Sequence, residues 1–139
     1  MIPEIGLQGQ EKIRNAKVAI VGCGGLGCPT LLYLASAGIG TIGIIDFDTV
    51  NITNLHRQIL FGINDVGQNK IDVAEKKIKA LHPEVIIIKH NVLMDKKNAE
   101  DILINYDFVI DGCDNFATRY IVNDACVKLN KTLVYGSIL

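Results

Sequence analysis

The sequence predicts an α/β fold, with a doubly wound, mainly parallel sheet of strand order 3-2-1-4-5 and helices on both faces. Short apolar runs alternate with helical patterns from one end of the chain to the other. These runs are continuous, as in strands that are covered on both faces. The first run leads directly into a glycine-rich turn and a helix, the order of a nucleotide-binding, Rossmann-like βαβ unit.

The 139 residues form one predicted domain, and its elements can be assigned in order. A short helix anchored by Ile13 precedes the first strand, and Gly38 and Gly40 stop the helix that follows that strand. The expected strands are residues 17–22, 41–46, 84–90, 107–111 and 132–136, and the expected main helices are 26–37, 67–82, 96–104 and 116–129.

The helix over 67–82 is predicted by an apolar stripe at spacings of 3, 4 and 3 residues. The stripe consists of Ile71, Ala74, Ile78 and Leu81. Lys70 lies in the first turn of this helix, at the end that faces the strand tips, so we single it out from the solvated lysines of the chain.

Three glycines of this turn each have a mechanical role. Gly22 permits the tight turn, Gly24 leaves room for a phosphate, and Gly27 lets the helix pack close to the strand. The free N–H groups of the helix then point at the bound anion. Asp46 follows Gly27 by 19 residues, where an acid accepts hydrogen bonds from ribose hydroxyls. The alternative is a structural turn that binds nothing.

Residues 47–66 are longer and more polar than a plain dinucleotide fold requires. Loops of this length inside a compact domain are uncommon and usually functional, although a solvated surface excursion is the alternative. The polar residues gathered here are Asn51, Asn54, His56, Arg57 and Gln58.

Fold geometry brings these groups to the edge where ligands bind. Arg57 and Lys70 supply cations, and Asp114, at the tip of the fourth strand, supplies a hard oxygen ligand that suits Mg²⁺. Capping of the next helix by Asp114 or Asn115 is the alternative to a ligand role. Hydride transfer needs neither the cation pair nor a metal, so the set favours ATP and nucleotidyl transfer over NAD.

Composition limits the partners. The net charge of −1 gives no general attraction to nucleic acid or to anionic membranes. No apolar run approaches the length of a membrane span, and the N-terminus lacks a signal pattern, so we expect a cytoplasmic protein. The cysteines fit small buried residues in a reducing compartment, and we expect no zinc site within this chain. They are Cys23, Cys28, Cys113 and Cys126.

Five motifs in order resemble those of the ThiF/MoeB/HesA family, whose E1-like adenylation domain is related to that of ubiquitin-activating enzymes. The match covers nearly the whole chain. The motifs are Gly22-Cys-Gly-Gly-Leu-Gly27, Asp46-Phe-Asp48, Asn54-Leu-His-Arg57-Gln58, Gly67-Gln-Asn-Lys70, and Cys113-Asp114-Asn115 with Arg119.

The resemblance implies a reaction in which the C-terminal glycine carboxylate of a ubiquitin-like sulfur-carrier protein ending in Gly-Gly attacks the α-phosphorus of ATP. Pyrophosphate leaves as the acyl-adenylate forms. Arg57, Lys70 and Asp114 are the implied catalytic residues, and Asp114 is the implied Mg²⁺ ligand. The implied nucleotide-binding residues are Gly22, Gly24, Gly27, Asp46, Asp48, Asn54, Arg57, Gln58, Lys70, Asp114 and Asn115.

Family members usually begin further upstream and continue well past position 139, through a carrier-binding loop and often two zinc-binding CxxC pairs. We therefore expect this chain to be the N-terminal part of such a domain, with a shortened natural protein as the alternative, and by resemblance a homodimer. Two alternatives stay open, namely an NAD-binding domain of an oxidoreductase and a non-catalytic scaffold subunit. The carrier and its pathway are not predicted by the sequence.

Overall fold

A computed structural model describes residues 3–136 of the chain. Its five strands form one all-parallel sheet with the order β3-β2-β1-β4-β5, which confirms the predicted topology. The strands are β1 (Lys17–Val21), β2 (Thr41–Ile45), β3 (Ile86–His90), β4 (Phe108–Asp111) and β5 (Thr132–Tyr135). The helices are α1 (Gly6–Asn15), α2 (Gly27–Ala37), α3 (Lys70–Leu81), α4 (Ala99–Leu103) and α5 (Phe116–Lys128).

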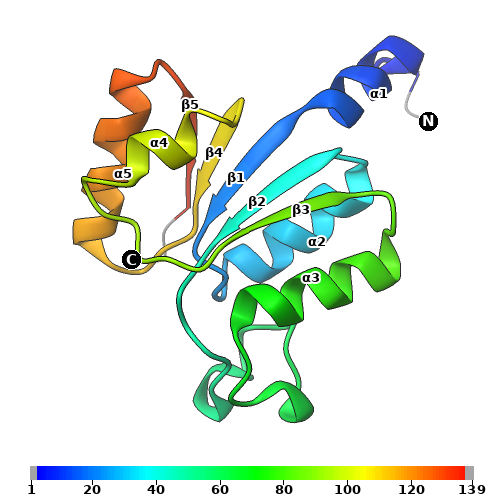
Figure 1. Cartoon of the computed structure of the whole chain (residues 1–139). Coiled ribbons are helices and arrows are strands. Elements are labelled where there is room, and N and C mark those ends of the chain that lie inside the picture. Colours follow the sequence, from blue (N-terminus) through cyan, green and yellow to red (C-terminus); the bar gives the residue numbers. More distant parts are fainter. Residues whose placement is uncertain (1–2, 137–139) are drawn as a thin grey trace.

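Helices cover both faces of the sheet, as Figure 1 shows. On one face α2 and α3 pack on β1 and β2 through a core that includes Ile20, Leu31 and Ile78. On the other face α4 and α5 enclose a second core around Val109 and Val122. The segment between β2 and α3, which includes two short 3₁₀ turns, η1 (Ile52–Asn54) and η2 (Ile63–Asp65), lies beyond the carboxyl ends of the strands.

The start of α3 differs from the prediction, because the helix begins at Lys70 and not at residue 67. The backbone of residues 67–69 pairs instead with residues 48–50. Gly67 N–H donates to the Val50 carbonyl over 2.9 Å, and Lys70 N–H donates to the Asp48 carbonyl over 3.0 Å. Gly67 has φ +87°, a backbone conformation that helices do not adopt. This pairing brings the Asp48 backbone beside the first turn of α3.

Two further expectations need correction. The helix predicted over 96–104 spans only Ala99–Leu103, because Asp95 Oδ1 accepts from the N–H groups of Lys97 and Asn98 and holds that segment as a turn. Leu81, predicted in the apolar stripe of α3, is 61% exposed.

The outer strand β3 also departs from the prediction. It begins at Ile86, two residues after the predicted start, and Ile86 and Ile88 are exposed on the described structure, so this strand is not covered on both faces. Within residues 3–136, no helix is long and apolar enough to cross a membrane.

Candidate functional site

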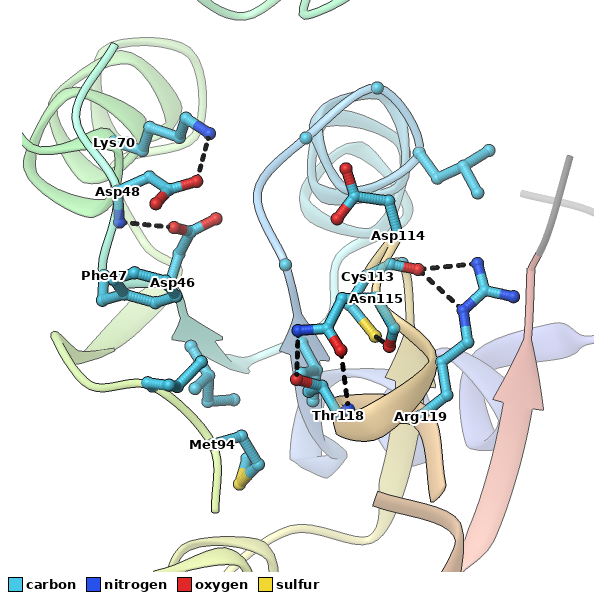
Figure 2. A pocket seen from close by; sticks show the side chains of 18 of the residues that line it. Asp46, Phe47, Asp48, Lys70, Met94, Cys113, Asp114, Asn115, Thr118 and Arg119 are labelled. Atoms are coloured by element: carbon cyan, nitrogen blue, oxygen red, sulfur yellow. Dashed lines mark hydrogen bonds and ion pairs between the residues drawn. The ribbon is translucent and has the colours of Figure 1, made fainter. Parts of the chain in front are cut away.

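One pocket of about 530 Å³ lies at the carboxyl ends of the central strands. It is bounded by the glycine turn after β1, by Asp46 and the segment after β2, and by the loop from β4 to α5. Figure 2 shows acidic and basic side chains entering it from these separate segments. The predicted residues Arg57, Lys70 and Asp114 all line this single pocket.

Of the three glycines that the sequence singles out in the turn, Gly22 and Gly27 leave little room for a side chain. Gly22 has φ +91°, and a Cβ built there would lie 3.1 Å from the Cys113 nitrogen. A Cβ at Gly27 would overlap the Gly22 carbonyl oxygen, so α2 packs directly on the turn. A Cβ at Gly24 would meet only Gln58 Nε2, at 3.8 Å. Gly24 lines the pocket, so its small size leaves that space open to a ligand.

The Asp46 carboxylate ties the glycine turn to the segment after β2. Its Oδ2 accepts from the Cys23 N–H at 2.7 Å, and its Oδ1 accepts from the Asp48 N–H at 2.8 Å. Each oxygen retains a further acceptor position. The carboxylate therefore orders the turn and is still able to accept hydrogen bonds from ribose hydroxyls.

The two cations reach the pocket differently. The Lys70 side chain is 6% exposed, and its Nζ lies 3.1 Å from Oδ2 of Asp48, whose side chain is 52% exposed. Arg57 is exposed, and its aliphatic stem passes the glycine turn, since a Cβ at Gly25 would lie 3.5 Å from Arg57 Cγ and Cδ. One positive charge is thus fixed inside the pocket, and the second belongs to an exposed side chain whose stem lies against the turn and whose Nη1 lies 3.4 Å from His56 Nε2.

Gln58 is buried and lines the pocket, and its Oε1 has no hydrogen-bond partner among residues 3–136. An unpaired buried acceptor is unfavourable. Phosphate oxygens at neutral pH cannot donate to it, but a hydroxyl or amino group can. The side-chain amide therefore suits a ligand that presents a donor to Oε1 and an acceptor to Nε2.

The loop from β4 to α5 carries Asp114 and Asn115. In Figure 2 these two residues lie across the pocket from Asp46, Asp48 and Lys70. Asn115 caps α5, since its Oδ1 accepts from the Thr118 N–H at 3.1 Å. The capping alternative therefore holds for Asn115, although this residue also lines the pocket. The Asp114 carboxylate has no hydrogen bond or ion pair with any residue of the described part of the chain.

Cys113 lies in the same loop, but its thiol is not a nucleophile at neutral pH. Burial and the neighbouring Asp111 carboxylate raise the pKa of Cys113 to about 12. Because the thiolate is the reactive form, the thiol stays protonated and unreactive here.

An apolar wall of the pocket was not predicted from the sequence. The pocket is lined by Phe47, which lies next to Asp46 in Figure 2, and by three residues that follow β3, namely Val92, Leu93 and Met94. The available signal was the run of three apolar residues in a loop at the ligand-binding edge of the sheet. Such a wall suits the flat face of a nucleobase.

Two predicted residues do not line the pocket. Gly27 is buried beneath the turn, where its role is packing, and Asn54 lies in η1, so its contact with a nucleotide stays a prediction.

Within residues 3–136 no group of three or more His, Cys, Asp or Glu side chains is arranged to hold a metal ion. Mg²⁺ is commonly held by one or two carboxylates together with substrate phosphates, so Asp114 fits that role without a complete protein cage.

Comparisons with known proteins identify the relatives of this chain. The model of the ThiF family matches residues 1–139. The chain is 50% identical over 138 residues to a probable adenylyltransferase/sulfurtransferase MoeZ of Mycobacterium tuberculosis, and 48% identical to a sulfur carrier protein adenylyltransferase of Thermus thermophilus. These matches cover 99% of this chain, but 35% and 51% of the two relatives. The chain therefore spans between about a third and about half of their length.

Solved structures show the same fold. The tRNA N6-threonylcarbamoyladenosine dehydratase TcdA of E. coli, in complex with ATP, superposes with a TM-score of 0.90 at 28% identity. That match covers 96% of this chain and 58% of TcdA. E. coli MccB, crystallised with AMPCPP and MccA, has a TM-score of 0.86 at 34% identity, and the match covers 92% of this chain and 38% of MccB.

Proposed function

The chain belongs to the ThiF family, and from this premise we propose that its protein uses ATP to adenylate the C-terminal glycine carboxylate of a ubiquitin-like sulfur-carrier protein, with release of pyrophosphate. One observation carries the proposal. Two cations, Arg57 and Lys70, and the unpaired carboxylate of Asp114 line the same pocket as the glycine turn. That combination suits a triphosphate, whose charge must be neutralised as it is cleaved.

The pocket offers a place for each part of ATP. The backbone of the glycine turn just before α2, at Gly24, Gly25 and Leu26, lines the pocket and, with the space over Gly24, receives the phosphates in this proposal. Asp46 holds the ribose hydroxyls, and the base lies against the apolar wall formed by Phe47, which is next to Asp46 in Figure 2, and Met94. This order places the α-phosphate near the glycine turn and the β- and γ-phosphates toward the cations.

The proposed chemistry needs positioning and charge stabilisation, and no general base. The attacking carboxylate of the carrier is already ionised at neutral pH. Its negative charge meets the negative α-phosphate, so cations that reduce this repulsion lower the barrier. Lys70 and Arg57 also stabilise the charge that accumulates on the departing pyrophosphate. The bond from the α-phosphorus to the bridging oxygen breaks as the new carboxyl–phosphorus bond forms.

Asp114 is the proposed ligand of Mg²⁺. When bound, the ion would supply positive charge to the phosphate oxygens. The Asp114 carboxylate is the hard oxygen donor that such an ion prefers. It has no hydrogen bond or ion pair with any of the described residues.

The oxidoreductase alternative is not favoured. The relatives reported above are named adenylyltransferases, and the similar TcdA structure contains ATP. An NAD-binding site would also leave the cations at positions 57 and 70 without a purpose. The non-catalytic scaffold alternative is tested by measuring whether the protein catalyses adenylation.

Pyrophosphate–ATP exchange tests the proposal, measured on the full-length protein with a carrier ending in Gly-Gly. We expect Mg²⁺-dependent exchange that falls by about 10²-fold or more in Asp114→Ala, as for removal of one transition-state contact. Asp124→Ala is the matched control, because Asp124 is an exposed carboxylate of α5 outside the pocket. Equal activity of wild type and Asp114→Ala would remove Asp114 from the mechanism. ATP binding without exchange would favour the scaffold, and thermal stabilisation by NAD but not by ATP would favour the oxidoreductase.

Three further parts of the proposal concern location, assembly and partners. A cytoplasmic location agrees with the four cysteines, all of which are free thiols. Assembly as a homodimer is proposed from the family resemblance, and sedimentation of the purified protein measures it. No binding of nucleic acid or membranes is proposed, given the net charge of −1.

A further inference from the structure

The peptide group that precedes Asp114 is held by a side chain of the following helix. Arg119, in the first turns of α5, donates to the Cys113 carbonyl from Nε at 3.0 Å and from Nη2 at 2.7 Å. Both bonds are drawn in Figure 2. Because the Cys113 carbonyl and the Asp114 nitrogen share one planar peptide, these bonds also fix the start of residue 114.

The guanidinium group is itself held in place from the other side. Its Nη1 donates to the Tyr135 hydroxyl at the end of β5. Its central carbon lies 4.9 Å from the centroid of the Tyr135 ring and 5.7 Å from that of Phe116. A flat fork with donors on separate edges makes these contacts at once, whereas a lysine ammonium cannot.

Residue 113 is also held at its nitrogen. The Cys113 N–H donates to Asp111 Oδ1 at 3.0 Å. The glycine turn packs against the same backbone, since a Cβ at Gly22 would lie 3.1 Å from the Cys113 nitrogen. Cys113 is thus fixed at both ends, next to an Asp114 carboxylate that has no partner within residues 3–136.

We propose that Arg119 is a positioning residue, which sets the Asp114 carboxylate in the nucleotide pocket through the Cys113 carbonyl. The inference rests on the proposed function, because it assigns Arg119 a part in the same adenylation step. A displacement of about 1 Å in a catalytic group costs about 10²-fold in rate. Arg119→Lys keeps the charge but loses the forked contact, so its kcat should fall by about 10- to 100-fold.

The test separates positioning from substrate binding, because Arg119 also lines the pocket. Pyrophosphate–ATP exchange is measured on the full-length protein as wild type, Arg119→Lys, Asp114→Asn and the double variant. If Arg119 acts through Asp114, the lysine substitution lowers kcat and changes the KM for ATP by less than about threefold, and it costs nothing further in the Asp114→Asn background. An equal loss in both backgrounds would overturn the proposal and indicate direct contact with a substrate.

A second measurement needs no activity. Amide hydrogen exchange of Cys113 reports whether the loop is held, and we expect it to accelerate by about tenfold or more in Arg119→Lys. Unchanged exchange would overturn the proposal even if kcat fell. Arg14→Lys, the same change at an exposed arginine of α1, is the matched control and should change neither kcat nor the exchange rate of the Cys113 amide. If the wild type itself shows no pyrophosphate exchange, the proposed function fails, while the Cys113 measurement still decides whether Arg119 holds the loop.

Discussion

Lys70→Met separates the binding role of the buried lysine from any structural role. The Lys70 side chain is 6% exposed and pairs with an Asp48 side chain that is 52% exposed. Asp48 therefore stays hydrated when its partner is lost, and a pair of this kind contributes about 0–1 kcal/mol. Methionine fills the space of the aliphatic stem and removes the cost of burying an ammonium. We expect the free energy of unfolding to change by less than about 1 kcal/mol in urea titrations.

The same substitution should weaken ATP binding. A hydrogen bond to a charged group contributes about 1.5–3 kcal/mol. At 1.4 kcal/mol for each factor of ten, this corresponds to a Kd for Mg²⁺–ATP that is about 10- to 140-fold higher by titration calorimetry. Lys77→Met is the matched control, because Lys77 is also paired on α3, with Asp65, but does not line the pocket. Its Kd should stay near that of the wild type.

The reasoning would be refuted by the reverse pattern. If Lys70→Met lost more than about 3 kcal/mol of stability and bound ATP as tightly as the wild type, the lysine would be a structural residue and not a ligand of the nucleotide. A loss of binding in Lys77→Met of similar size would show that the charge of α3, and not the position of Lys70, governs affinity.

Two other predictions concern the fold behind the site. A Cβ at Gly43 would overlap the Tyr106 hydroxyl and the Cζ and Cε1 atoms of its ring, so Gly43→Ala should lower the free energy of unfolding by about 1–3 kcal/mol. Because Tyr106→Leu removes that ring, the loss in the double variant should be smaller than the sum of the two single losses, and additive losses would contradict the clash. Burial lowers the pKa of His90 below its ordinary 6.5, so the unfolded chain takes up this proton first and stability should decline as pH falls below about 6.5. His90→Gln should flatten that decline in urea titrations, and an unchanged slope would assign it to other groups.

The strands and the glycine turn could be predicted from the sequence because each is marked by residues that lie close together in the chain. Each apolar run is bounded by its own turn residues, as Gly38 shows with φ +90° at the end of α2. Once the runs are ordered, right-handed crossovers leave few topologies. The strands and helices other than β3, α3 and α4 agree with their predicted bounds to within one residue where bounds were given.

The local shape of the site was less accessible, because it depends on contacts between residues distant in the chain. The apolar stripe of α3 begins at Ile71 and does not mark where the helix starts, whereas pairing of 67–69 with 48–50 excludes these residues from it. Residue type alone also does not decide whether Asn115 caps α5 or contacts a ligand, since both roles use the same amide oxygen. The link from Arg119 to Tyr135 joins a helix to a strand 16 residues away, and no local pattern indicates it.

The pairing of polar groups argues for function more strongly than the glycine turn does. Asp46 and Asn115 satisfy backbone N–H groups, as in a stable fold without a ligand. Gln58 Oε1 is buried and has no partner among residues 3–136, and the exposed Asp114 carboxylate lines the same pocket without a hydrogen bond or ion pair to a described residue. A turn that served only the fold would gain stability by satisfying or replacing the buried amide oxygen. A ligand that donates a hydrogen bond to Gln58 from a hydroxyl or amino group, and that brings a cation to Asp114, would account for both groups.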